Sequence, residues 1–411
     1  MIKITENWAI KEFGDIVSIK CSKFDPKSQN ERRKCIELEH IEQQSGRIVG
    51  YTNTFESTST KNVFSKGDVL FGKLRPYLRK FAQAPFDGVC SSEIWVFTPQ
   101  KSIRNDFLYY LIQSDSFLDQ ANKSCGTKMP RADWKVVSKY NFLLPPLVEQ
   151  QKIAEVLSTV DKKIDLIDQK IAETEKLKTG LMQKLFSEGI GVQDENGNWQ
   201  PHTDFKSSGY PDCWKVMQLK SIAKVITGKT PPPANTENYG GDYMFVSPSD
   251  LGSRKYISYT KSTLSKQGVN NGKVVPKGAI FFTCIGSTIG KIGISTQECC
   301  TNQQINTVIL EKDGYTSEYV YYALSHISES IKRLAGIQAV PIVKKSLFES
   351  QFIPIPPQEE QQVIAETLAT VDLKLDILDK QKAETQQLKK GLMQKLLTGE
   401  WRVPVEETEA A

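Results

Sequence analysis

A segment of 41 residues occurs twice in this chain, at a constant offset of 211 positions and without a gap. The first copy is PPLVEQQKIAEVLSTVDKKIDLIDQKIAETEKLKTGLMQKL (145–185), and the second is PPQEEQQVIAETLATVDLKLDILDKQKAETQQLKKGLMQKL (356–396). The two copies are identical at 26 of the 41 positions. Because the offset is about half the chain of 411 residues, the sequence predicts two tandem halves, each a globular part followed by this segment.

Apolar residues in each copy recur at alternating spacings of four and three, which is the pattern of a coiled-coil seam. They are Ile153, Leu157, Val160, Ile164, Ile167 and Ile171, and Ile364, Leu368, Val371, Leu375 and Leu378. Apolar positions resume at Leu177, Leu181 and Leu185, and at Leu388, Leu392 and Leu396, after one extra step of three. That step predicts a local shift of the stripe around the helix. The two helices are expected to pair with each other antiparallel, because the second globular part can then join them without a long return connection.

The globular parts show signals of both strands and helices. Apolar runs at 69–71, 94–97 and 279–282 predict strands, and 106–120 and 317–334 predict helices. The expected fold class is α+β: two mixed α/β domains in a pseudo-two-fold arrangement, separated by two long antiparallel coiled-coil helices. The predicted boundaries are 1–145 and 211–356 for the two globular domains, 146–187 and 357–399 for the helical regions, 188–210 for a linker and 400–411 for an acidic tail.

Composition limits the class of protein. Hydrophobic residues make up 39% of the chain and charged residues 25%, with no run of about 18 apolar residues and no apolar stretch after the start, so we expect a cytoplasmic globular protein. The eight cysteines form no CxxC pair and there are only three histidines, so neither a zinc site nor a disulfide framework is indicated. The net charge of +5 lies in the globular parts, while the repeated segments are nearly balanced. This favours a polyanion as partner of the former and protein as partner of the latter, although a few extra surface lysines can also mean nothing.

No catalytic motif is evident. His40, His202 and His326 are scattered, and no base-flipping loop of the type Asn-Pro-Pro-Tyr or glycine-rich methyl-donor motif occurs. The stretch ITGKT (226–230) has the Gly-Lys-Thr of a phosphate loop, but the position that needs the first glycine is Ala223. We therefore expect a protein that does no chemistry itself.

The order of globular part, PPLVEQQKIAEVLSTVD…GLMQKLF, second globular part and IPPQEEQQVIAETLATVD…GLMQKLLTG resembles the specificity subunit of Type I restriction-modification systems over essentially the whole chain. The resemblance implies that each recognition domain reads one half of a split DNA target and that the helices set the gap. It also implies two methyltransferase subunits bound to the helices and endonuclease subunits recruited to the complex. No cofactor is implied for this chain; S-adenosylmethionine, ATP and Mg are expected on the partner subunits.

Candidate DNA contacts are basic residues near aromatic ones, and amides. Arginine can read guanine, lysine mostly holds phosphate, amides suit adenine, and a carboxylate can accept from cytosine. In the first half the candidates are Lys73, Arg75, Tyr77, Arg79, Lys80, Glu93, Lys128 and Arg131. In the second half they are Lys229, Lys291, Asn302, Gln303, Gln304, Lys344 and Lys345. For each of them the alternative is an ordinary solvated surface residue.

Candidate partner contacts lie at the start of each repeated segment, on the outer face of the helices: Glu149, Gln150, Gln151, Glu360, Gln361 and Gln362. The alternative is that they are helix-starting residues near the positive end of the helix dipole. Two other functions stay open at this level. One is a specificity subunit of a non-Type I modification or defence complex, and the other is a coiled-coil scaffold that reads no DNA.

Overall fold

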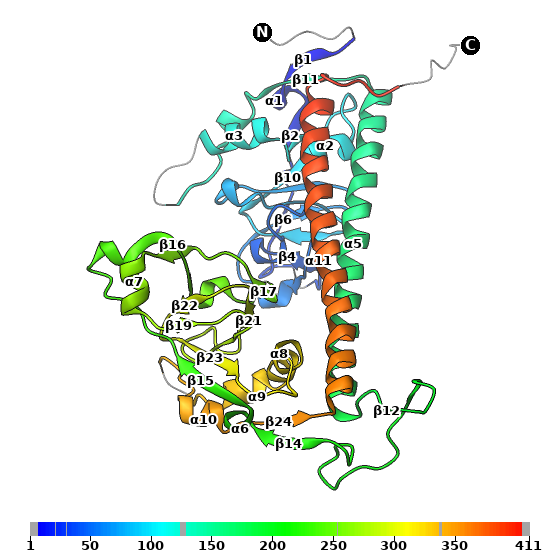
Figure 1. Ribbon diagram of the computed structural model, residues 1–411. Coiled ribbons are helices and arrows are strands. Elements are labelled where there is room, and N and C mark those ends of the chain that lie inside the picture. Colours follow the sequence, from blue (N-terminus) through cyan, green and yellow to red (C-terminus); the bar gives the residue numbers. More distant parts are fainter. Residues whose placement is uncertain are drawn as a thin grey trace. The chain divides into compact units, whose positions relative to one another are not determined.

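The computed structural model describes residues 7–20, 22–29, 31–123, 129–252, 254–336 and 339–404. The chain forms two compact units, and each contains one globular part and a portion of both long helices. Unit 1 comprises residues 1–169 and 380–411, and unit 2 comprises residues 170–379. Unit 1 therefore depends on both ends of the chain (Figure 1).

Unit 1 contains two sheets and a separate strand pair. The pair joins β1 (Ala9–Glu12) to β11 (Asn141–Leu144). One sheet has the order β2-β10-β7-β8 and the other β3-β6-β9-β4-β5. The bounds are β2 Val17–Ile19, β3 Lys23–Phe24, β4 Lys34–Ile36, β5 Thr52–Asn53, β6 Lys61–Phe64, β7 Val69–Gly72, β8 Phe81–Gln83, β9 Gly88–Cys90 and β10 Ile94–Pro99. The helices are α1 Phe13–Ile16, α2 Asn105–Leu111, α3 Asp115–Lys123 and α4 Trp134–Val137, with 3-10 turns η1 Leu38–His40, η2 Thr54–Glu56 and η3 Pro76–Leu78.

Unit 2 repeats this composition and adds a hairpin, β12 (Val192–Gln193) with β13 (Trp199–Gln200). The strand pair is β14 (Lys215–Gln218) with β24 (Phe352–Ile355), and the sheets have the orders β15-β23-β20-β21-β17 and β18-β16-β22-β19. The bounds are β15 Ala223–Thr227, β16 Tyr239–Val246, β17 Tyr256–Ile257, β18 Ser262–Leu264, β19 Val274–Val275, β20 Ile280–Thr283, β21 Ile292–Ser295, β22 Cys299–Thr301 and β23 Ile305–Leu310. The helices are α6 Leu219–Ile222, α7 Lys266–Asn271, α8 Ser317–His326, α9 Ser328–Arg333 and α10 Lys345–Glu349, with 3-10 turns η4 Thr236–Asn238 and η5 Pro248–Asp250.

The two units share one plan of strand pairing. β10 lies antiparallel between β2 and β7 in unit 1, as β23 lies between β15 and β20 in unit 2. β9 pairs parallel with β4 and antiparallel with β6, and β22 pairs in the same way with β16 and β19. Each globular part is therefore a copy of one α+β fold.

The predicted strands are confirmed as β7, β10 and β20, whereas each long predicted helix is divided in two. In unit 1 the helix predicted over 106–120 is α2 followed by α3. The Ser114 hydroxyl accepts the Phe117 N–H at 3.3 Å, so a capping side chain begins the second helix inside the predicted one. In unit 2 the helix predicted over 317–334 is interrupted at Ile327, whose ψ is 4°.

The long helices are α5 (Leu147–Ser187) and α11 (Gln358–Leu397). They pair antiparallel within unit 1, because Asp161 of α5 binds Lys389 of α11 at 2.8 Å while Asp168, further along α5, binds Lys382 at 2.7 Å (Figure 1). None of the helices in the described part of the chain is both long and apolar enough to span a lipid bilayer.

The predicted shift of the apolar stripe is wrong. The spacing of four and three continues without interruption, because Thr174 and Thr385 are buried at the next seam position, and Lys178 and Lys389 follow them. Leu177 and Leu388, which the sequence suggested for the seam, are about half exposed. A polar layer therefore replaces one apolar layer in each unit.

Each polar layer joins the globular part to both helices. In unit 1, Asp161 accepts the Tyr110 hydroxyl of α2 at 2.9 Å and binds Lys389, whose Nζ also donates to Gln113 at 3.0 Å. In unit 2, Asp372 accepts the Tyr322 hydroxyl of α8 at 2.6 Å and binds Lys178 at 2.6 Å. The tyrosine, aspartate and lysine thus come from three different elements in both units.

Substitutions on α5 should distinguish the buried face of this helix from its exposed face. Leu157→Ala removes a fully buried side chain that packs in the core of unit 1, so we expect the free energy of unfolding of this unit to fall by about 2–5 kcal/mol. Leu166→Ala, on the exposed side of the same helix, is the matched control and should change it by less than about 0.5 kcal/mol. Urea unfolding measures both, and equal effects would contradict the assigned seam.

Candidate nucleic-acid interface

Three loops of unit 1 converge at one end of its sheets. The loop after β7 contacts the turn between β9 and β10, because Lys73 N–H donates to the Glu93 carbonyl at 2.9 Å. It also contacts the segment before α4, because Arg75 N–H donates to the Pro130 carbonyl at 2.7 Å and Ala132 N–H donates to the Lys73 carbonyl at 2.8 Å. Candidate residues that are far apart in the sequence therefore lie together on one backbone frame.

The side chains on this frame in unit 1 are charged and largely exposed. Arg131 Nε donates to both carboxylate oxygens of Glu93, at 3.0 and 3.2 Å. The hydrogen bond and the charge of Glu93 raise the pKa of Arg131 above its ordinary value. Tyr77 is 53% exposed on η3, beside Arg75, and Lys73 is half-buried. This surface offers arginine donors, a carboxylate and an aromatic ring side by side.

Arg75 occupies a backbone position that favours glycine. Its φ is 53°, in the left-handed region, and the equivalent residue of unit 2 is Gly286 with φ 88°. A side chain in this conformation costs on the order of 1–2 kcal/mol. Arg79, four residues later, has the same φ of 53° and binds Asp115 inside the unit, so an external contact of Arg75 stays a prediction.

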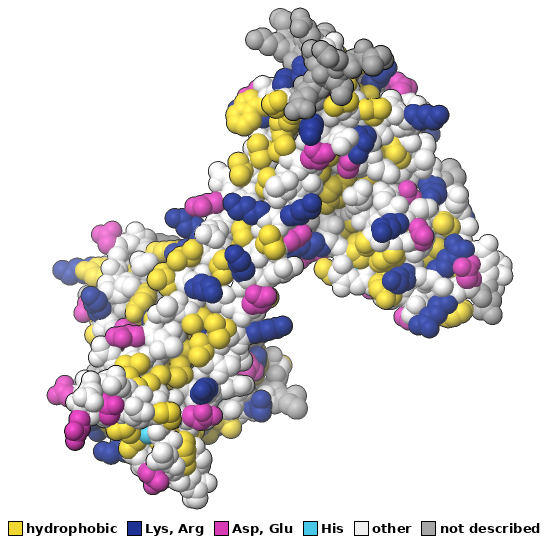
Figure 2. All heavy atoms as spheres, turned by 90° about the vertical axis from the view of Figure 1, so that its right-hand side faces the viewer, with side chains coloured by type: hydrophobic (Ala, Val, Ile, Leu, Met, Phe, Trp, Pro, Cys, Tyr) yellow, Lys and Arg dark blue, Asp and Glu magenta, His cyan; other side chains and the backbone are white. Residues whose placement is uncertain are grey.

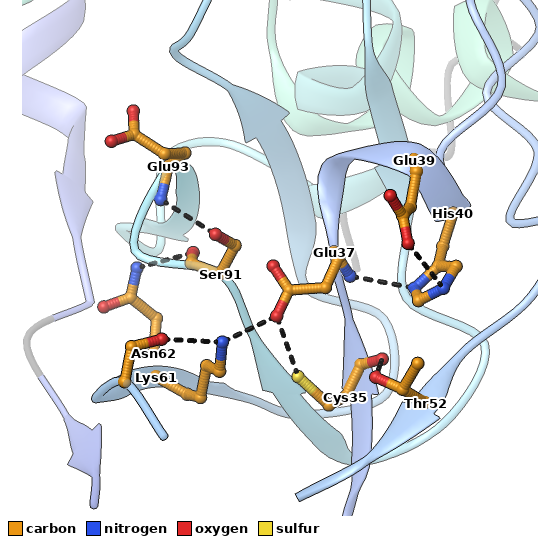
Figure 3. A network of polar contacts seen from close by, with 10 residues as sticks. Cys35, Glu37, Glu39, His40, Thr52, Lys61, Asn62, Ser91 and Glu93 are labelled. Carbon is orange, nitrogen blue, oxygen red and sulfur yellow. Dashed lines mark hydrogen bonds and ion pairs between the residues drawn. The ribbon is translucent and has the colours of Figure 1, made fainter. Parts of the chain in front are cut away.

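A polar network underlies the turn that carries Glu93 (Figure 3). Asn62 Nδ2 donates to the Ile94 carbonyl at 2.8 Å, and Glu93 N–H donates to the Ser91 hydroxyl at 3.4 Å, while the Glu93 carboxylate points away from the network. Beside them, buried Lys61 binds Glu37 at 2.6 Å. Burial raises the pKa of Glu37, but the hydrogen bond and charge of Lys61 outweigh burial and hold that pKa below its ordinary value. Hydrogen bonds from Asn62 and to Ser91 therefore hold the turn that carries Glu93.

Three further candidates of unit 1 are placed differently. Arg79 binds Asp115 at 2.6 Å, and Lys80 Nζ donates to the Leu38 carbonyl in η1, so both side chains already have partners inside the unit. Lys128 lies outside the described residues. DNA contact by Arg79, Lys80 and Lys128 stays a prediction.

Unit 2 contains the same frame with different side chains. Cys284 N–H donates to the Gln304 carbonyl and Val343 N–H to the Cys284 carbonyl, both at 2.8 Å, while Gly286 N–H donates to the Pro341 carbonyl at 2.9 Å. Each bond matches one in unit 1 at an offset of 211, as do the isolated bridges Leu74–Arg131 and Ile285–Ile342. Glu93 is therefore equivalent to Gln304, and Arg131 to Ile342.

Amides dominate the surface of this second frame. Asn302 Nδ2 donates to Gln304 Oε1 at 3.0 Å, and the exposed Gln303 accepts the Thr230 hydroxyl. The loop that carries exposed Lys229 packs against them, because Gly228 has no side chain: a Cβ there would lie 2.1 Å from the Asn302 carbonyl oxygen. The ITGKT stretch thus ends β15 and supports this turn.

The remaining lysines of unit 2 lie around the frame. Lys344 and Lys345 are exposed at the start of α10, and Lys345 binds Glu349 at 3.6 Å. Lys291 Nζ donates to the Pro248 carbonyl in η5 at 3.3 Å, as Lys80 does to η1 in unit 1. Lys80 and Lys291 therefore anchor equivalent 3-10 turns.

The predicted partner contacts at the helix starts need correction. Glu149 and Glu360 are buried, and their carboxylates accept the indole N–H of Trp8 at 3.0 Å and of Trp214 at 2.8 Å. Gln150 and Gln361 are also buried, with Nε2 bound to the carbonyls of Pro145 and Pro356 respectively. These four residues have internal hydrogen-bond partners and are not available to a partner protein. Gln151 and Gln362 are exposed, so partner contact stays a prediction for them.

Comparison with known proteins places the chain in a family. The model of the Type I restriction modification DNA specificity domain matches residues 5–176 and again residues 211–387. The chain belongs to this family. It is a Type I specificity subunit with two target recognition domains, one in each matched segment.

Individual relatives agree with the family. The Type I restriction enzyme MjaVIII specificity subunit of Methanocaldococcus jannaschii is 28% identical over 77% of this chain and 75% of its own length. The HindI specificity subunit of Haemophilus influenzae is 25% identical over 83% of this chain and 88% of its own length. A solved chain of a type I R-M system has a TM-score of 0.63 at 20% identity and covers 97% of this chain and 100% of the other, which shows a common fold.

One basic group of this specificity subunit is not among the DNA contacts predicted from the sequence. Arg32, Arg33 and Lys34 line a shallow cavity of 360 Å³ in unit 1 with Tyr51 and Asn53. Lys34 Nζ lies 4.8 Å from the centre of the Tyr51 ring. The run ERRK at 31–34 is a detectable signal, but the nearby aromatic ring is brought there only by the pairing of β4 with β5.

The Lys61–Glu37 pair predicts a specific dependence on pH. Because the pKa of Glu37 is lowered in the folded chain, its contribution to stability is present above the ordinary value of 4.5 and is lost as the pH falls through the folded pKa. The unfolding midpoints of the wild type and of Glu37→Gln should therefore differ most near pH 7 and converge as the pH falls below 4.5 and through the folded pKa. A difference that does not change with pH would refute the charged pair.

Proposed function

We propose that this specificity subunit reads a split target in double-stranded DNA, with one half contacted by each unit. The observation that carries the proposal is the occurrence of one backbone frame twice in a chain, with exposed charged residues on one copy and amides on the other. Base edges in the major groove are distinguished by such donors and acceptors. Two copies with different side chains suit a target whose halves differ in sequence.

The helices α5 and α11 are proposed to set the gap between the halves and to bind two methyltransferase subunits. Apolar side chains on their outer sides support a protein partner. They are Leu166 and Leu388 in unit 1, and Leu177, Leu373 and Ile377 in unit 2, each between 49% and 59% exposed. In the view turned toward these helices, apolar side chains alternate with lysine, arginine and carboxylates, which differs from a continuous basic strip for DNA (Figure 2).

The chain itself is proposed to perform no chemistry. Methylation and cleavage would belong to methyltransferase and endonuclease subunits, which would carry S-adenosylmethionine, ATP and Mg, and the complex would act in the cytoplasm. Modification of DNA by the purified chain alone would contradict this assignment.

Exchange of one globular domain tests modular reading. Replacement of residues 1–145 by another recognition domain should change one half of the methylated sequence, because the frame of unit 1 lies in this segment together with all its candidate contacts. Co-expression with the methyltransferase subunit and sequencing of modified adenines measures the result. The other half should stay unchanged, and simultaneous change of both halves would contradict two independent readers.

Substitution of the outer apolar residues tests the docking surface. Leu166→Asp and Ile377→Asp remove equivalent exposed side chains of the two units, so we expect each to weaken methyltransferase binding by at least about tenfold with little effect on folding. The matched control is Gln169→Asp, an exposed residue that offers no apolar surface. Pull-down and size-exclusion chromatography measure the stoichiometry, and unchanged binding by both variants would exclude this surface.

A further inference from the structure

The two units provide an internal comparison, because equivalent positions carry different side chains on matched backbone. The bonds that hold the three loops together are the same in both units. Two positions on this frame differ in a chemically meaningful way: Glu93 against Gln304, and Arg131 against Ile342. All four side chains are at least partly exposed. Because the backbone bonds are the same and these side chains reach the surface, the differences bear on what each frame contacts.

In unit 1 the two positions together complement a C·G base pair. Glu93 and Arg131 are adjacent, with Arg131 Nε 3.0 Å from Glu93 Oε2. A glutamate accepts from the cytosine N4 amino group, and an arginine donates to guanine O6 and N7. Arginine has five N–H donors, and the bonds to Glu93 use Nε, so the guanidinium can hold the carboxylate and still face a base.

In unit 2 the same two positions complement an A·T base pair. A glutamine can bind adenine N6 and N7 in a bidentate manner, and an apolar side chain contacts the thymine methyl group. Gln304 is held in place by Asn302, and its Nε2 lies 3.5 Å from the Ile285 carbonyl. Ile342 is 43% exposed although it is apolar, and its neighbour in the isolated bridge is that same Ile285. Gln304 and Ile342 therefore lie on adjacent backbone.

We infer that these two equivalent positions determine one base pair in each half of the target. Glu93 and Arg131 read a C·G pair in the half bound by unit 1, and Gln304 with Ile342 reads an A·T pair in the half bound by unit 2. This inference rests on the proposed function. It goes beyond that function because it names the positions and the class of base pair.

Transfer of the unit 2 side chains to unit 1 tests the inference. In the double variant Glu93→Gln/Arg131→Ile, the half read by unit 1 should change at one position from C·G to A·T, while the half read by unit 2 should stay as in the wild type. The complex with methyltransferase subunits is used, modified adenines are mapped by sequencing, and binding to duplexes that differ at that position is measured. The preference between C·G and A·T duplexes should shift by roughly 5- to 150-fold.

Controls separate this inference from stability and from the proposed function. Glu93→Gln alone is a milder variant for use if the double variant does not assemble. It should weaken the discrimination between C·G and A·T at the same position. Lys66→Ala removes an exposed charge before β7, at the opposite end of that strand from the frame, and should leave the target unchanged.

Three outcomes would overturn the inference: a wild-type half without a C·G pair for unit 1, an unchanged first half in the variants, or a change in both halves. Failure of the proposed function is distinguishable, because the wild-type complex would then modify no split sequence at all.

Discussion

In each unit, a half-buried aspartate at the meeting point of the globular part and the two long helices holds these three elements in register. Asp161 accepts from Tyr110 and Lys389, and Asp372 accepts from Tyr322 and Lys178. A carboxylate removed from water is costly unless it is paired and hydrogen-bonded. Burial raises the pKa of both tyrosines, with the neighbouring aspartate adding to it, so their hydroxyl groups stay protonated donors. The aspartate gains both partners only when all three elements are in place, so the layer fixes their relative orientation.

At the start of each long helix, a buried glutamate likewise binds residues from distant segments. Glu149, at the start of α5, binds Trp8 from one end of the chain and Arg402 from the other. Glu360, at the start of α11, binds Trp214, His202 and the Ile190 N–H from the segment that follows α5. The segment after each helix therefore returns to the start of the other helix. The folding of unit 1 consequently requires residues from both termini, whereas unit 2 is continuous in sequence.

These constraints leave the exposed side chains of the loop frames free to vary. Backbone hydrogen bonds hold the loops, and the network of Asn62 and Ser91 supports the turn of unit 1 from below. Lys80 and Lys291 perform equivalent anchoring roles, each through a hydrogen bond to a main-chain carbonyl. A scaffold held by the main chain can change its specificity through a few outward residues without loss of fold. The contrast between Glu93 and Gln304 is the change of this kind that we propose within a single chain.

The repeated segment was sufficient to predict two halves, long helices and their antiparallel pairing, because a period of 3.5 residues and a constant offset are properties of sequence alone. The polar layer was not predictable, because an apolar residue such as Leu177 is expected at the seam. Only the structure shows that Lys178 takes this position and binds Asp372. For the same reason Glu149 was taken as a surface residue: its partners lie 141 residues earlier and 253 residues later. The candidate contacts around Arg75, Glu93 and Arg131 were recognised by residue type, but which of them share a surface was decided by strand pairing. The sequence by itself thus determined the plan of the chain through local periodicity and repetition, and only the tertiary structure decided which polar side chains are internal and which face outward, because that depends on contacts between distant segments.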